Sequence, residues 1–127
     1  MIGDSHTIKI TVDHSKLAST VGSGELDVLA TPMMIAAMEQ AASELLGRSL
    51  EAGQTSVGTM LSVAHSAATP LGMQVEVTAT VTAAEGRRVE FDVTAKDACG
   101  EIGKGTHSRF IVDAARFQAK TDAKLEA

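Results

Sequence analysis

The sequence predicts an α+β fold in which one long, mostly apolar helix packs against an antiparallel β-sheet. A helix-start signal at Thr31 and Pro32 opens a long apolar segment, and most of the chain beyond Gly53 alternates apolar and polar residues with the period of a strand. The length of 127 residues suits one hydrophobic core, and neither an internal repeat nor a linker divides the chain. We therefore expect residues 1–127 to form one domain.

Charge and composition exclude several classes of partner. The net charge is −5, and the eleven Lys and Arg residues are scattered along the sequence, whereas a nucleic-acid surface needs them clustered. No apolar run approaches the roughly 18 residues of a membrane span, and residues 1–6 lack the blocks of a signal peptide. Cys99 is the only cysteine, which excludes an internal disulfide and fits a reducing compartment. We expect a cytoplasmic protein without nucleic-acid or membrane partners.

The first half of the chain predicts a strand, a loop and a helix. Residues 7–12 alternate as a half-buried strand does, and residues 15–27 are rich in Ser, Gly and charge, which predicts a mobile loop and a candidate lid. Thr31 is the expected N-cap of a helix over residues 32–50, with Pro32 at the first position, where no N–H is needed. Only a narrow polar stripe interrupts the apolar surface of this helix, so protein should enclose most of it.

The second half predicts four further strands, over residues 56–65, 73–83, 89–95 and 101–112. Turn signals at residues 85–86 and 98–101 predict that these strands form a consecutive antiparallel set, which with the first strand gives a five-stranded sheet wrapped around the helix. Residues 113–127 predict a weak helix or a frayed end. One sheet cannot cover the whole helix or its own edge strands, so we expect a second copy of the chain to cover the remaining surface. The alternative is a monomer in which the polar stripe of the helix is exposed to solvent.

Two titratable residues are candidates for chemistry. Glu39 lies at the edge of the polar stripe, where a carboxylate held against apolar surface becomes a usable base near neutral pH; an ordinary solvated glutamate is the alternative. His65 ends a strand on the same face as Val57, Leu61 and Val63, and an imidazole there can exchange protons. The alternative, which is commoner for a single histidine, is that His65 is only hydrogen-bonded at the strand end and has no role in catalysis.

Helix geometry constrains how Thr31 and Glu39 could act together. The capping role explains Thr31 without any function. The two residues are eight positions apart, roughly 12 Å along one straight helix. A site that uses both must place the substrate between them or take one of them from a second chain.

The remaining patterns point to no metal or other cofactor. The histidines lack metal-ligand spacing; they are His6, His14, His65 and His107. Residues 103–108 superficially resemble a phosphate loop, but they lie in a strand pattern with no helix behind them.

Three segments together resemble the fluoroacetyl-CoA thioesterase family of hot-dog proteins. They read ATPMMIAAME at residues 30–39, VGT at 57–59 continuing to VAHSAATP at 63–70, and EIGKGTHSR at 101–109. Their order and spacing agree with the family across about residues 26–120, which is most of the chain.

The resemblance implies a hot-dog fold and hydrolysis of an acyl-CoA thioester to free acid and CoA at the interface of a homodimer or a larger assembly. It places Thr31, Glu39 and His65 as the catalytic residues. Glu39 and His65 would support attack on the carbonyl and proton transfer to the leaving thiolate, and Thr31 would position the reacting groups. The resemblance also implies that Gly58 lies close to the acyl group and that Arg109 is a further pocket residue, with no cofactor.

One departure from the family narrows the expected substrate. The fluoroacetyl-selective member is expected to close its pocket with aromatic side chains ahead of the helix, whereas residues 26–29 contain none. We therefore expect a short acyl-CoA substrate without fluoroacetyl selectivity. Two other functions stay open: a non-catalytic acyl-thioester-binding or structural dimer, and an enoyl-thioester hydratase, which would need a helix-borne histidine that residues 32–50 lack.

Overall fold

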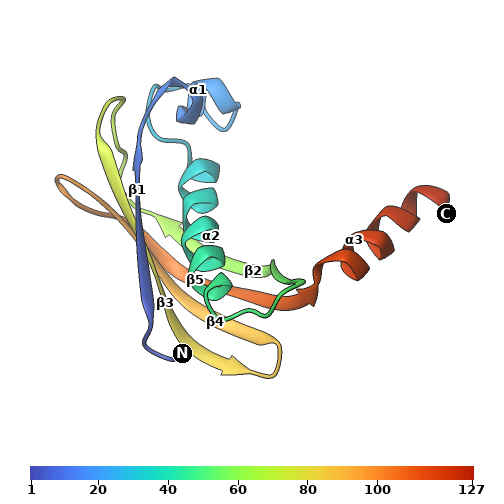
Figure 1. Cartoon of the computed structure of the whole chain (residues 1–127). Coiled ribbons are helices and arrows are strands. Elements are labelled where there is room, and N and C mark those ends of the chain that lie inside the picture. The colour runs from blue at the N-terminus through green and yellow to red at the C-terminus, as the bar shows by residue number, and fades with distance from the viewer.

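The computed structural model describes residues 1–127, in which one antiparallel sheet curves around a long helix (Figure 1). The strands are β1 (Ser5–Thr11), β2 (Gln54–His65), β3 (Gln74–Glu85), β4 (Arg88–Asp97) and β5 (Gly100–Asp113). Their order in the sheet is β1-β3-β4-β5-β2, and every neighbouring pair is antiparallel. The predicted α+β class, with a five-stranded sheet wrapped around one helix, is confirmed.

The position of strand β2 differs from the prediction. Strands β3, β4 and β5 are consecutive and joined by tight turns at residues 86–87 and 98–99, but β2 pairs with β5 rather than with β3. The expectation that β2 continues the consecutive set was therefore wrong. Residues 66–73 form no hairpin turn, because their backbone bonds elsewhere: Ser66 N–H donates to the carbonyl of Ile102, and Leu29 N–H donates to the carbonyl of Thr69. This crossover leaves β2 at an edge of the sheet.

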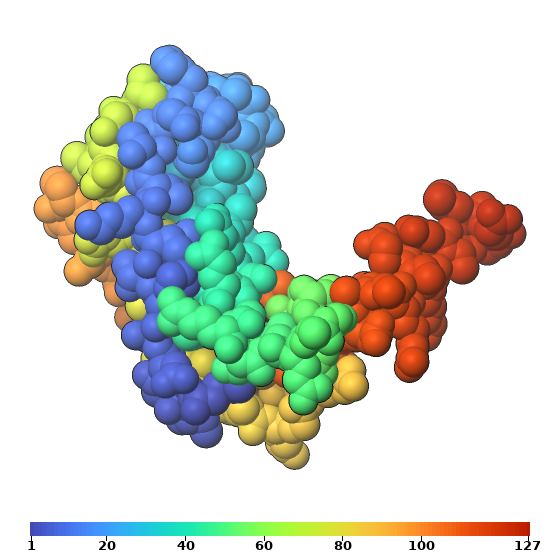
Figure 2. All heavy atoms as spheres, viewed as in Figure 1, coloured from blue at the N-terminus to red at the C-terminus, as the bar shows by residue number.

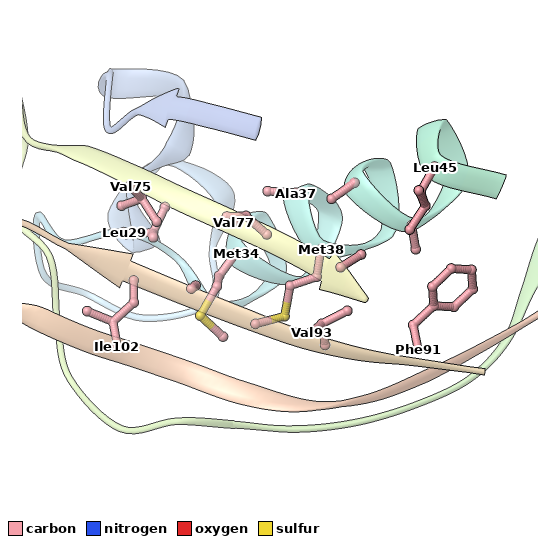
Figure 3. Packing of buried hydrophobic residues seen from close by; sticks show 14 of the residues in the cluster. Leu29, Met34, Ala37, Met38, Leu45, Val75, Val77, Phe91, Val93 and Ile102 are labelled. Carbon is pink, nitrogen blue, oxygen red and sulfur yellow. The ribbon is translucent and has the colours of Figure 1, made fainter. Parts of the chain in front are cut away.

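The central helix α2 spans Thr31–Gly47 and lies across the concave face of the sheet (Figure 1). It ends earlier than the predicted residue 50, because the N–H groups of Arg48 and Ser49 bond to carbonyls only three residues back, which tightens the last turn. Its buried side chains point at the strands, as Figure 3 shows, and interlock with buried residues of β3, β4 and β5. The central members of this core are Met34, Met38, Leu45, Val77, Phe91, Val93 and Ile102. The core holds α2 rigidly, so residues on its remaining face have fixed positions.

The predicted loop over residues 15–27 is partly helical. It contains the short 3-10 helix η1 (His14–Lys16) and the short helix α1 (Ala18–Val21). Leu17 and Ala18 are buried, and Leu17 forms a β-bridge with Leu29, which fastens the segment to the start of α2. Residues 22–27 are exposed beyond this anchor. The expectation of a loop throughout was therefore wrong for residues 15–21, because the burial of Leu17 and Ala18 outweighs the loop-like composition.

The C-terminal segment forms helix α3 (Ala114–Asp122), followed by the 3-10 helix η2 (Ala123–Glu126). Asp113 caps α3, since its carboxylate accepts from the N–H of Arg116. Neither helix buries a residue, and both project away from the sheet (Figures 1 and 2). Of the two outcomes predicted for residues 113–127, the helix is therefore the one observed. None of the helices is both long and apolar enough to cross a membrane.

Candidate active site

Thr31 and His65 meet at the N-terminal end of α2. The Thr31 hydroxyl oxygen and His65 Nδ1 are 2.7 Å apart, which is a short hydrogen bond between side chains of α2 and the end of β2. Ala30 occupies the N-cap position without a side-chain bond, and Thr31 is the first helical residue. The expectation that Thr31 caps the helix was therefore wrong, because its hydroxyl bonds to the imidazole instead of to the free N–H groups of the helix. We call Thr31 and His65 the Thr31 half-site.

The imidazole of His65 has one nitrogen without a partner. Nδ1 bonds to Thr31, whereas Nε2 is shielded from solvent and makes no hydrogen bond. Buried polar atoms are normally bonded, so an unpartnered ring nitrogen beside a cavity is a candidate for contact with a reacting group. The half-site thus presents an imidazole oriented by a hydroxyl and free to exchange a proton on its other side.

A cavity of about 340 Å³ opens beside this half-site. Thr31 and His65 line it together with α1, the exposed residues after α1 and residues 66–68. Its other walls are small or aliphatic side chains and short polar ones, among them Leu26, Val28 and Ser66, and no aromatic ring takes part. A cavity of this kind suits a small acyl group.

Glu39 lies in different surroundings from those the sequence suggested. Its carboxylate oxygen Oε2 is 3.9 Å from Nη1 of Arg109, and 45% of the Glu39 side chain is exposed. A Cβ atom on Gly58 would come within 2.8 Å of the same oxygen, so only glycine leaves room for the carboxylate there. The neighbours of the carboxylate are therefore a guanidinium and a bare stretch of backbone rather than apolar surface. We call Glu39, Gly58 and Arg109 the Glu39 half-site.

Arg109 is buried and held by three contacts besides Glu39. Only 7% of the residue is exposed. Its Nε donates to the Ser56 hydroxyl at 2.8 Å, and its Nη2 donates to the Ser56 carbonyl at 3.0 Å. Nη1 donates to Nε2 of His107 at 3.3 Å. Burial lowers the pKa of Arg109, and the negative charge of the nearby Glu39 carboxylate opposes this shift.

His107 supports Arg109 from the core side. Its Nδ1–H donates to the carbonyl of Met60 at 2.8 Å, which leaves Nε2 as the acceptor that Arg109 uses. The ring stacks on Phe91 with centroids 6.1 Å apart. Burial lowers the pKa of His107 below its ordinary value, and the positive charge of Arg109 acts in the same direction. The imidazole is therefore neutral near pH 7 and fixed in one tautomer.

Neither His107 nor Ser56 was recognised as part of a site from the sequence. His107 was considered only as a metal ligand, yet its position two residues before Arg109 in a strand places both side chains on the same face. That spacing was the available signal. Ser56 gave no comparable signal, because its contact with Arg109 depends on how β2 pairs with β5.

A β-bulge in β2 decides which residues face α2. Gly58 pairs with Arg109 and Met60 with Ser108, so three residues of β2 match two of β5. The extra residue lets Gly58 and His65 face α2 together although their numbers have opposite parity. Placing Val57 on the face of His65 was therefore wrong, because that prediction assumed uninterrupted alternation.

One chain brings Thr31 and His65 together but keeps them apart from Glu39. The Glu39 half-site includes Gly58 in the first half of β2, and the other half-site includes His65 at the end of β2, roughly 20 Å away along the strand. The cavity beside His65 has neither Glu39 nor Arg109 in its walls. The structure therefore contains two separate half-sites.

Comparison with known proteins assigns the family. A protein-family model described as fluoroacetyl-CoA-specific thioesterase matches residues 12–115. The chain belongs to this family. A fluoroacetyl-CoA thioesterase of Streptantibioticus cattleyicolor is 43% identical over 101 residues, which cover 80% of this chain and 73% of that protein.

Solved structures agree with this assignment. The structure of a fluoroacetyl-CoA thioesterase is similar with a TM-score of 0.92 and 35% identity, covering 98% of this chain and 96% of the other. A thioesterase-superfamily protein of Thermus thermophilus is similar with a TM-score of 0.91 and 27% identity over 99% and 93% of the two chains. These comparisons confirm three predictions: the family, the hot-dog fold and the thioesterase class.

Proposed function

We propose that this protein hydrolyses a short-chain acyl-CoA thioester to the free acid and CoA at a site shared by two copies of the chain. The observation that carries the proposal is the pair of half-sites. Each contains groups suited to thioester hydrolysis, and each is incomplete alone. A second copy that joins the Thr31 half-site of one chain to the Glu39 half-site of the other would complete two equivalent sites.

The edge position of β2 supports this arrangement. Both half-sites contain a residue of β2, Gly58 in one and His65 in the other, and one side of this strand has no partner in the sheet. If two copies pair antiparallel about a two-fold axis beside Leu61 and Ser62, Gly58 of one chain lies opposite His65 of the second copy. The pairing would also cover a strand edge that is otherwise open to aggregation.

The proposed chemistry uses each group as the structure presents it. Glu39 supplies an electron pair, either to the thioester carbonyl carbon or to a proton of the attacking water, and the adjacent Arg109 stabilises its negative charge. As the carbon–sulfur bond breaks, His65 gives a proton to the leaving thiolate through Nε2, and Thr31 orients the ring through Nδ1. The water oxygen ends in the carboxylic acid, and no metal or other cofactor is required.

The acyl group would occupy the cavity beside the Thr31 half-site. A cavity without aromatic walls has no ring to close over the acyl group, so we propose acceptance of several short acyl groups without preference for fluoroacetyl. We also propose the cytoplasm as the location, since CoA esters are intracellular metabolites and the exposed thiol of Cys99 suits a reducing compartment.

A complementation experiment tests the shared site. Glu39→Gln and His65→Ala should each abolish thiol release from acetyl-CoA, propionyl-CoA and fluoroacetyl-CoA while the circular dichroism spectrum stays unchanged. Co-refolding the two inactive variants should restore about one quarter of the wild-type activity, because random pairing gives half heterodimers with one intact site each. Full activity in both single variants would contradict the catalytic assignment.

Other outcomes of this experiment separate the alternatives. No recovery on mixing, with both single variants inactive, would mean that one chain supplies the whole site. Tight binding of CoA esters without turnover by the wild-type protein would instead indicate the non-catalytic dimer. An enoyl-thioester hydratase is disfavoured because α2 contains no histidine.

A further inference from the structure

A second hollow lies where β5 runs into α3, away from both half-sites. It encloses about 380 Å³ and is formed by the end of β5, one face of α3 and the turn between β3 and β4. Its main walls are Phe110, Phe117, Arg87, Arg116 and Lys120. We call it the α3 hollow. In Figure 2 its helical wall stands clear of the rest of the protein.

Positive charge converges on the α3 hollow in an acidic protein. Arg87, Arg116 and Lys120 come from two separate stretches of sequence, and none of them forms an ion pair, although the net charge of the chain is −5. The one carboxylate in the walls, Asp113, accepts a hydrogen bond from the Arg116 N–H as the cap of α3. Arg87 is held in place because its Nη1 donates to the Ile111 carbonyl at 3.3 Å. Unpaired cations gathered in a concave surface favour an anion.

Two exposed aromatic rings accompany these cations. The chain has only three phenylalanines; Phe91 is buried in the core, whereas Phe110 and Phe117 are 42% and 43% exposed and both line the α3 hollow. Exposed phenyl rings beside arginine and lysine provide stacking surface for a base and charge for phosphates. This combination suits a nucleotide better than a simple anion, because a simple anion has no use for a stacking surface.

We propose that the α3 hollow binds the nucleotide end of the CoA substrate, with the adenine on the phenyl rings and the phosphates on Arg87, Arg116 and Lys120. The inference rests on the proposed function, since it assumes a CoA ester as substrate. The pantetheine arm separates the thioester from the diphosphate, so the nucleotide must bind at a distance from the reacting carbonyl. Arg109 and Phe110 are consecutive in β5, so the α3 hollow lies at the same end of the sheet as the Glu39 half-site, with the Phe110 side chain on the opposite face of β5 from Arg109.

A comparison of two substrates tests the inference. Acetyl-CoA and acetyl-pantetheine carry the same thioester, but only the first has the nucleotide. In the double variant Arg116→Gln and Lys120→Gln, KM for acetyl-CoA should rise about tenfold with kcat unchanged, and both constants for acetyl-pantetheine should match those of the wild type. The double variant Lys104→Gln and Lys124→Gln, which removes the same charge outside the α3 hollow, should leave KM for acetyl-CoA unchanged.

Calorimetry with adenosine 3′,5′-bisphosphate tests the α3 hollow independently of turnover. The wild-type protein should bind this probe, and the Arg116→Gln and Lys120→Gln variant should lose most of the affinity. Absence of binding to the wild type, or equal loss of activity with both substrates, would overturn the inference while leaving hydrolysis intact. If the wild type binds the probe but hydrolyses neither ester, the proposed function fails and the nucleotide site stands. A change of oligomeric state in the variant, seen by sedimentation, would overturn the inference in favour of a surface that contacts a second copy.

Discussion

The two half-sites differ in how completely their side chains are bonded. In the Glu39 half-site, Arg109 contacts Ser56, His107 and Glu39, and His107 is bonded at both ring nitrogens. In the Thr31 half-site, one hydrogen bond joins Thr31 to His65, and Nε2 of His65 has no partner. The hydrogen bonds of Arg109 and His107 all form within one chain, whereas Nε2 of His65 is left for a group outside the chain. Variants of the two half-sites should therefore fail in different ways.

Among variants that keep Glu39 and His65, the largest effect is expected from Arg109→Lys. Lysine cannot reproduce the forked contacts with Ser56 and His107, so the ammonium would not hold the position beside Glu39. We expect kcat/KM for acetyl-CoA to fall about a hundredfold, measured by thiol release. Arg48→Lys, at an exposed position on the far end of α2, is the matched control. Activity within twofold of wild type would show that the bonded network is not needed.

A smaller effect is expected from Gly58→Ala. The new methyl group would lie 2.8 Å from Glu39 Oε2 and 3.2 Å from His107 Cε1, so the carboxylate must move. We expect kcat to fall about thirtyfold, because small displacements of a reacting group are costly. Gly47→Ala adds the same methyl group where no atom lies within 4 Å and should leave activity unchanged. Equal activity in the two variants would contradict the placement of Glu39.

Thr31→Val tests the Thr31 half-site, in which fewer hydrogen bonds are formed. Valine keeps the shape of threonine but removes the hydroxyl that bonds His65 Nδ1, so the imidazole loses its orientation. We expect kcat to fall about tenfold and the melting temperature to stay within a degree or two, because Ala30 rather than Thr31 is the N-cap. Thr31→Ser, which retains the hydroxyl, should keep most of the activity. A large loss of stability in Thr31→Val would indicate a capping role after all.

The smallest expected effect is a pH dependence of stability that comes from His107. Burial lowers its pKa in the folded state, so below about pH 6.5 the unfolded chain binds a proton that the folded chain does not. The free energy of unfolding should therefore decrease as pH falls through this range. His107→Gln, whose amide oxygen can accept from Arg109, should show a shallower decrease in urea titrations at pH 7 and pH 5.5. Identical slopes for the two proteins would mean that His107 does not titrate differently on folding.

Local patterns in the sequence were sufficient for most of the fold. The alternation in β3 and β4 and the apolar surface of α2 follow from residue spacing, because burial of one face requires that spacing. The order of β2 in the sheet could not be predicted in this way. Turn signals join β3 to β4 and β4 to β5, but no hairpin turn joins β2 to β3, and the pairing of β2 with β5 is a contact between distant segments. The bulge that places Gly58 and His65 on one face also arises from the pairing of β2 with β5, so it could not be predicted from local patterns.

The site was predicted in part. Glu39, His65 and Thr31 were considered from their own positions and given catalytic roles by the resemblance to a family, and Gly58 and Arg109 came from the resemblance alone. The structure divides these five residues between two half-sites. His107 was missed, because only its bonds to Met60 and Arg109 distinguish it from an ordinary strand residue. The cations of the α3 hollow are scattered in sequence and converge only when β5, α3 and the β3–β4 turn meet.

By itself, the sequence determined the class of the fold, the long apolar helix, the strand periodicity and, through its motifs, the family. These properties depend on neighbouring residues and on spacing within one segment. Only the tertiary structure decided the edge position of β2, the buried partners of Arg109 and the separation of Glu39 from His65. Those features depend on contacts between segments far apart in the chain, whose energies no local pattern records.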